Sequence, residues 1–123
     1  MAMRVESVVI DAADPQAMAA WWAELLGWTV KPGGDDDEVA ILAPDPATSG
    51  LRAMLFLRVP EAKAGKNRLH IDLHPEDQDA EVARAESLGA RRVDIGQGEQ
   101  PWIVLADPEG NEFCLLRSRV DPL

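Results

Sequence analysis

Apolar positions follow a strand pattern and then a helical pattern at the start of the chain. Residues 5–10 are rich in β-branched side chains and predict a strand. Asp14 and Pro15 then predict a helix start, because aspartate caps free N–H groups and proline has no N–H to leave unpaired. Gly27 predicts the helix end in a left-handed conformation. The apolar residues of this helix recur at i, i+3, i+4 and i+7, and they are Met18, Trp21, Trp22 and Leu25.

Three more apolar runs follow, and turn-forming residues separate them. Glycines and aspartates interrupt the pattern at residues 33–37, and prolines, serine and glycine interrupt it at residues 44–50. The runs predict strands over residues 28–30, 39–43 and 51–59.

The same order then begins again. Residues 68–73 predict a strand, and residues 74–77 supply the polar start of a second helix. Val82, Ala85 and Leu88 form its apolar stripe, and Gly89 predicts its end. The remaining strands are predicted over residues 91–95, 102–106 and 112–117.

Matching residues at a constant offset support a duplication. Positions 62 apart pair Leu26-Gly27 with Leu88-Gly89, Ile41 with Ile103, and Asp45-Pro46 with Asp107-Pro108. We therefore expect an α+β fold of two tandem βαβββ modules, residues 1–63 and 64–123, in a single domain. Each half is too small to bury a sheet face alone, so pairing the halves forms one core and leaves the faces without helices around a shared cleft.

Composition narrows the class of partner. The 123 residues are 46% hydrophobic, enough for one core, and their formal charge of −10 repels nucleic acids and anionic membranes. Cys114 has no second cysteine to pair with, and the N-terminal residues lack a long apolar run. We expect a soluble cytoplasmic protein with a small-molecule ligand and no nucleic-acid or membrane partner.

Two charged groups have open interpretations. Residues 35–38 are all acidic and suit either a solvated hairpin turn or a hard cation, although the spacing of a calcium loop is missing. A basic group around the middle of the chain suits either solvated surface or an anionic ligand, and it comprises Arg58, Lys63, Lys66 and Arg68.

Four motifs, in order, resemble the vicinal oxygen chelate superfamily, which includes glyoxalases and bleomycin-resistance proteins. They cover most of the chain and lie at residues 13–28, 55–61, 66–73 and 105–113. The resemblance implies a cupped eight-stranded mixed sheet, the glyoxalase/bleomycin resistance/dioxygenase fold. It further implies an active cleft inside the cup and, in catalytic members, a divalent metal with two to four side-chain ligands.

The resemblance places the four ligand positions at the first and last strands of the modules. The usual histidine ligand is retained as His70, and Cys114 replaces the usual glutamate ligand. At the other two positions Ser7 and Leu57 replace the usual ligands. His70 and Cys114 are thus the candidate metal ligands, and a thiolate with an imidazole suits zinc better than magnesium or manganese. If a divalent metal binds, only these two side chains are expected to hold it.

Other roles are open for the same residues. His70 suits a hydrogen-bonded cleft residue or a metal-free general acid or base, with Asp72 on the same strand face to orient it. Cys114 suits a small buried hydrophobe or a reactive thiol. Trp102 suits the core or one wall of the cleft.

Two functions remain open from the sequence. One is an enzyme of the lyase, isomerase or dioxygenase type, with a metal or positioned donors that stabilise an anion. The other is a metal-free protein that binds a small, antibiotic-like molecule and confers resistance. A homodimer is expected in either case, and a dimerisation domain with a vestigial cup is a third alternative.

Overall fold

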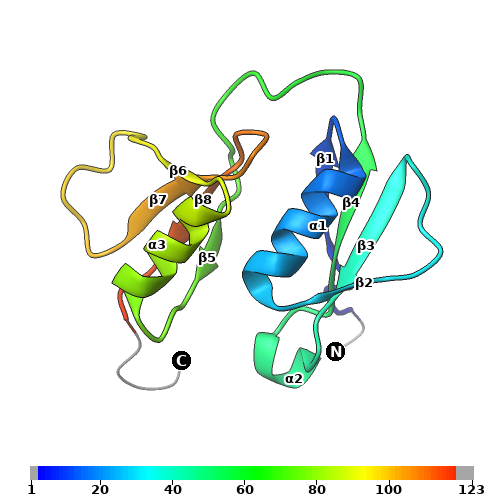
Figure 1. Ribbon diagram of the computed structural model, residues 1–123, viewed down its shortest axis with the longest axis horizontal. Coiled ribbons are helices and arrows are strands. Elements are labelled where there is room, and N and C mark those ends of the chain that lie inside the picture. Colours follow the sequence, from blue (N-terminus) through cyan, green and yellow to red (C-terminus); the bar gives the residue numbers. More distant parts are fainter. Residues whose placement is uncertain (1–2, 119–123) are drawn as a thin grey trace. The chain divides into compact units, whose positions relative to one another are not determined.

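The computed structural model describes residues 3–118, and it contains the predicted order of strand, helix and three strands twice (Figure 1). The chain divides into two compact units, one ending at Ala62 and the other beginning at Lys63. Each unit contains one four-stranded sheet. The fold is therefore α+β with two tandem modules, as the sequence predicts.

The first unit forms a mixed sheet. Its elements are β1 (Val8–Ala12), α1 (Pro15–Leu26), β2 (Thr29–Val30), β3 (Glu38–Leu42), α2 (Pro46–Ser49) and β4 (Ala53–Arg58). The strand order is β1-β4-β3-β2, in which β1 and β4 are parallel and the other neighbours antiparallel.

The second unit repeats this topology. Its elements are β5 (Ile71–Leu73), α3 (Gln78–Ser87), β6 (Arg91–Arg92), β7 (Ile103–Ala106) and β8 (Glu112–Leu115). The strand order is β5-β8-β7-β6, again with one parallel pair, β5 and β8.

The predicted ends of α1 are confirmed. The Asp14 carboxylate accepts a hydrogen bond from the Ala17 N–H at 3.1 Å, and Pro15 occupies the first turn. Gly27 ends the helix with φ of 69°, a conformation that a side chain would oppose. Both helix ends thus follow from local sequence.

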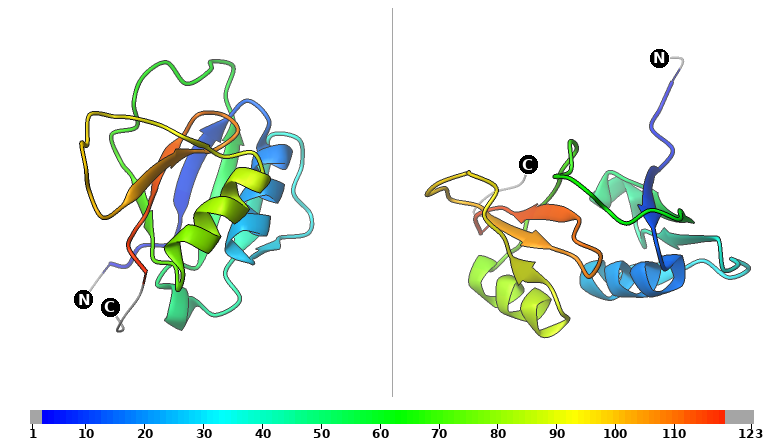
Figure 2. Two further views of the ribbon diagram at one scale, coloured as in Figure 1. Left: turned by 60° about the vertical axis from the view of Figure 1, so that its left-hand side comes forward. Right: turned by 90° about the horizontal axis from the view of Figure 1, so that it is seen from above.

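One face of α1 packs on the first sheet (Figure 2). Met18 and Trp22 are almost fully buried, and so are Ile41, Met54 and Phe56 of β3 and β4. Trp21 is only partly buried, and its ring meets that of Trp22 edge to face with centroids 5.3 Å apart. The apolar stripe of the sequence is therefore the core of this unit.

Some predicted boundaries differ because side chains take backbone hydrogen bonds. The segment expected to be only a separator contains the one-turn helix α2, which the Asp45 carboxylate caps through the Ala47 N–H at 3.1 Å. The strand predicted over residues 91–95 ends at Arg92, because Asp94 accepts from the Gly96 N–H and Gln97 from the Ile95 N–H.

The strand predicted over residues 68–73 begins only at Ile71. The N–H of Asn67, just before it, donates to the Glu112 side chain at 2.7 Å rather than to a neighbouring strand. His70 consequently lies just outside β5. No helix among residues 3–118 has the length and apolar character needed to cross a membrane.

The packing predicts unequal losses of stability for substitutions at two adjacent residues of β3. Ile41 is 0% exposed, whereas Leu42 is 39% exposed and points to the other sheet face. Ile41→Ala should cost about 2–5 kcal/mol of unfolding free energy and Leu42→Ala about 1 kcal/mol or less, measured by urea unfolding. Equal losses would show that the register of β3 is wrong.

Candidate functional site

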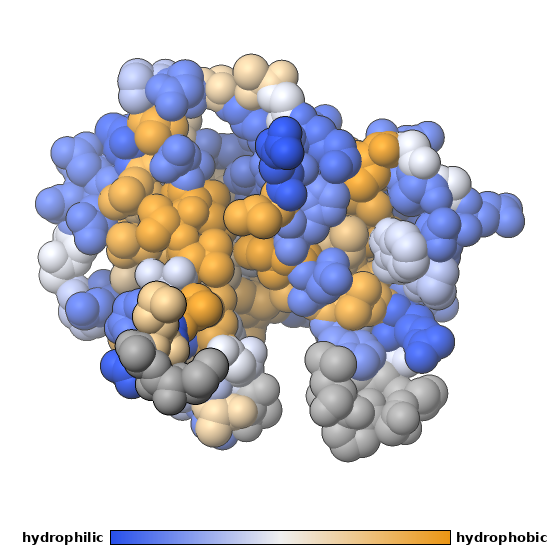
Figure 3. All heavy atoms as spheres, turned by 180° about the vertical axis from the view of Figure 1, so that it is seen from behind, coloured by the Kyte–Doolittle hydropathy of each residue, from blue (hydrophilic) through white to orange (hydrophobic). Residues whose placement is uncertain are grey.

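The first sheet has one face that α1 does not cover. Strand alternation places alternate residues of β1, β3 and β4 on this face, and we call five of them the open face: Val9, Ala40, Leu42, Leu55 and Leu57. Val9 is 49% exposed, and Ala40, Leu55 and Leu57 are partly exposed. Viewed from behind, the first unit presents a broad apolar area (Figure 3).

A pocket of about 300 Å³ lies at one edge of the open face. Ala40 and Leu55 form its apolar part, and Lys31, Asp35 and Glu38 form much of its polar rim. The pocket therefore combines an apolar floor with charges of both signs.

The acidic segment that forms this rim is fixed by hydrogen bonds. The Asp35 carboxylate accepts from the N–H groups of Asp37 and Glu38, both at 2.9 Å. The Arg58 guanidinium donates to the Asp36 carbonyl at 2.8 Å, to the Ala13 carbonyl at 2.6 Å and to the Asp37 carboxylate at 3.1 Å. Residues 35–37 thus form an exposed turn that leads into β3 at Glu38. Arg58 ties this turn to the end of β1, so its donors are used within the fold rather than by an anion.

The second unit contains an ion pair whose carboxylate is buried. Glu112 is 7% exposed, and its carboxylate meets the Lys63 ammonium at 2.7 Å and the Asn67 N–H at 2.7 Å. Burial opposes its ionisation, but the hydrogen bond from Lys63, that from Asn67 and the charge of Lys63 together lower the pKa of Glu112. Glu112 is therefore ionised at neutral pH.

His70 and Asp72 are both exposed beside this ion pair. The His70 ring contacts the Asn67 carbonyl through Nε2 at 3.0 Å. Asp72 pairs with Cys114 across β5 and β8. Burial, followed by the charge of Asp72 and a hydrogen bond to it, raises the pKa of the Cys114 thiol against the opposing charge of Lys66. Cys114 is thus a buried, protonated thiol at neutral pH.

The other predicted site residues lie in both units. Ser7 lies just before β1, two residues before Val9, and Leu57 belongs to the open face. Trp102 is partly buried just before β7. The segment preceding it is anchored, because the Gln78 side chain donates to the Pro101 carbonyl at 2.8 Å.

These residues do not fit a divalent metal. Within residues 3–118, no three histidine, cysteine, aspartate or glutamate side chains lie close enough together to hold an ion. Leu57 has no donor atom, His70 uses Nε2 for a carbonyl, and Cys114 would have to lose a proton that its surroundings retain.

Sequence reasoning missed Glu112, Lys63 and Asn67 as a cluster. The available signal was a carboxylate inside an apolar strand, next to Phe113, Cys114 and Leu115. A charge in that position needs a buried cation or N–H donor.

A family model described as "Glyoxalase-like domain" matches residues 7–116. No curated protein matches the chain.

Solved structures share the fold at low identity. "Oxidase ChaP-H2" is 18% identical with a TM-score of 0.68, over 97% of this chain and 96% of that one. A glyoxalase/bleomycin resistance protein/dioxygenase family enzyme from Burkholderia phytofirmans PsJN is 20% identical with a TM-score of 0.67, over 89% and 94%. A mutant of the fosfomycin resistance protein FosX from Listeria monocytogenes, complexed with Mn(II) and 1S,2S-dihydroxypropylphosphonic acid, is 16% identical with a TM-score of 0.69, over 98% and 94%.

The lowered pKa of Glu112 predicts a pH-dependent contribution to stability. A carboxylate with a lowered folded-state pKa stabilises the protein above its unfolded-state pKa, and this stability is lost as pH falls through the folded-state value. Glu112→Gln should therefore cost about 1.5–3 kcal/mol at pH 7, and clearly less below about pH 4, by urea unfolding.

Glu99→Gln is the control, since Glu99 is an exposed acid of the same unit. It should cost little at either pH. A cost of Glu112→Gln that stays constant or grows on acidification would contradict the ionised pair.

Proposed function

The chain belongs to the glyoxalase-like domain family, within the vicinal oxygen chelate superfamily, and from its site we propose that it binds a small organic molecule without a metal ion. The apolar part of that molecule contacts the open face of the first sheet. This is the metal-free alternative that the sequence left open.

The exposed apolar surface of the open face carries the proposal. Apolar surface left in water costs about 25 cal/mol per Å², so covering roughly 200 Å² of it contributes about 5 kcal/mol, from which the cost of association is subtracted. The neighbouring pocket, with Lys31 and Glu38 on its rim, supplies polar atoms that orient a ligand.

In the second unit, taken by itself, four residues are proposed as ligand contacts. His70 and Asp72 are exposed and offer an acceptor or donor and a carboxylate, Trp102 offers a partly exposed ring, and Cys114 sits buried beside Asp72. Ser7, just before β1, is proposed as a polar contact next to the open face.

The donor set supports binding over metal-dependent chemistry. The Listeria protein is described with Mn(II), and resistance proteins are among the structural relatives. In this chain the positions that the family resemblance assigns to metal ligands hold Ser7, Leu57, His70 and Cys114, which supply few donor atoms. A resistance-type role, in which a small molecule is held rather than converted, is therefore the form of the proposal we favour.

Two further expectations belong to this proposal. We propose that the protein works in the cytoplasm and forms a homodimer. Sedimentation velocity would measure the second of these directly.

Binding should be detected as fluorescence enhancement of anilinonaphthalene sulfonate and as thermal stabilisation by members of a small aromatic library. A ligand at 100 times its Kd should add about 2.7 kcal/mol of stability. Leu55→Gln should weaken binding at least tenfold, because it places an amide on the open face.

Leu69→Gln is the matched control, since Leu69 is 88% exposed and lies in the other unit. It should leave binding unchanged, and so should EDTA. Binding or turnover that EDTA abolishes and a divalent ion restores would refute the proposal.

A further inference from the structure

The connector between the two sheets is attached to the second sheet by Glu112. Residues 59–70 form no helix or strand, and most of them are exposed. Lys63 and Asn67 nevertheless both reach the Glu112 carboxylate, one through Nζ to Oε2 and the other through its N–H to Oε1, each at 2.7 Å. The Asn67 side chain adds a longer bond to the Glu112 carbonyl at 3.4 Å.

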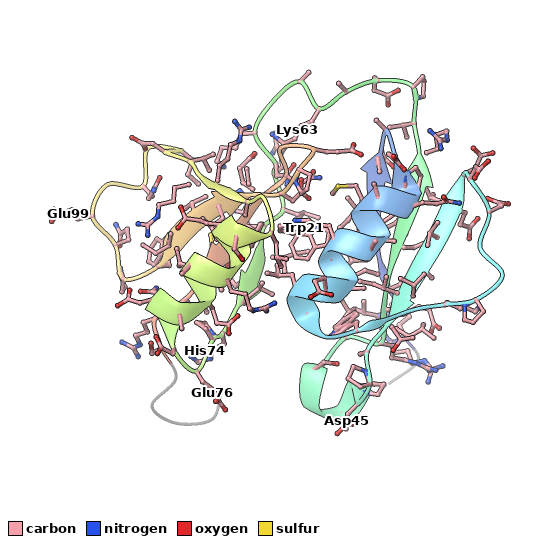
Figure 4. All side chains as sticks on the ribbon, viewed as in Figure 1. Trp21, Asp45, Lys63, His74, Glu76 and Glu99 are labelled. Carbon is pink, nitrogen blue, oxygen red and sulfur yellow. The ribbon has the colours of Figure 1, made fainter. Side chains whose placement is uncertain are left out.

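These contacts are stronger than ordinary surface contacts. Glu112 is 7% exposed and the Lys63 side chain 23% exposed, so water competes weakly for the carboxylate. The Lys63 ammonium also donates to the Gly65 carbonyl, which closes a turn of the connector around it. Figure 4 shows Lys63 where the connector passes the turn between β7 and β8.

Asn67 links this ion pair to His70. Its N–H donates a hydrogen bond to the Glu112 carboxylate. Its carbonyl accepts from His70 Nε2 at 3.0 Å and, more weakly, from Lys66 Nζ at 3.5 Å. A carbonyl oxygen only accepts hydrogen bonds. The neutral His70 ring must therefore carry its proton on Nε2, which leaves Nδ1 as the acceptor.

We propose that Glu112 is a positioning residue for His70: it holds the connector on the second sheet and, through the Asn67 carbonyl, fixes the Nε2–H tautomer of the ring. Nδ1 of His70 then presents a fixed acceptor to a ligand that carries a hydroxyl or N–H group. The ligand part of this inference rests on the proposed function, whereas the tautomer does not.

Long-range proton–nitrogen NMR spectra of the ligand-free protein in alkaline buffer test the tautomer. The chain has two histidines, so His74, at the other end of β5, serves as an internal reference. The native protein should show His70 mainly as the Nε2–H form. Glu112→Ala should move His70 toward a mixture of tautomers, leave His74 unchanged and raise amide exchange over residues 63–70 at least tenfold.

Two further variants separate positioning from general damage to the fold. Glu112→Gln keeps an oxygen for the Asn67 N–H and should preserve most of the tautomer preference. Lys63→Met removes the ammonium while leaving that bond, and it provides a second test if Glu112→Ala does not fold. Glu99→Gln, the exposed control, should match the native protein.

The inference is overturned if His70 is mainly the Nδ1–H form in the native protein, or if its tautomer and the exchange of residues 63–70 are unchanged in Glu112→Ala. Binding of anilinonaphthalene sulfonate is measured on the same samples. If the dye does not bind but the tautomer responds as expected, the proposed function fails and the role of Glu112 stands.

Discussion

The structure depends on one geometric constraint: each four-stranded sheet has one long helix, and adjacent residues of a strand point to opposite faces. In the first unit, α1 covers the face that carries Ile41 and Phe56. The residues that alternate with them along β3 and β4 point to the other face, which α1 leaves uncovered. The open face is thus a direct consequence of having a single long helix. Its apolar composition, rather than its existence, is what supports the proposed ligand.

The second sheet resolves the same constraint differently. Both faces of β8 are buried, and Glu112 and Cys114 share the face opposite Phe113. A carboxylate there is tolerable only with partners, and the connector supplies them from Lys63 and Asn67. The residues around His70 are consequently ordered by an ion pair, whereas the first unit offers apolar surface. The two units therefore carry different chemistry.

The sequence predicted what depends on local pattern. Asp14, Gly27 and the stripe through Trp22 determine α1 within a few residues of chain, and the offset between Ile41 and Ile103 revealed the second module. The helix α2, the late start of β5 and the Glu112 cluster were missed. In these places a side-chain carboxylate accepts a hydrogen bond from a backbone N–H group, and the linear pattern does not show such bonds. Lys63 and Glu112 are far apart in the chain, and no periodicity connects them. The superfamily resemblance assigned the ligand positions, which stay predictions, and the surroundings of His70 and Cys114 came only from the structure.

A crystal structure with a compound selected by thermal stabilisation tests the central claim, which is metal-independent binding on the open face. The account predicts density for the compound against Leu55 and Leu57, with no anomalous peak from a metal near His70 or Cys114. A compound held by a divalent ion at those two residues, or bound away from the open face, would contradict it.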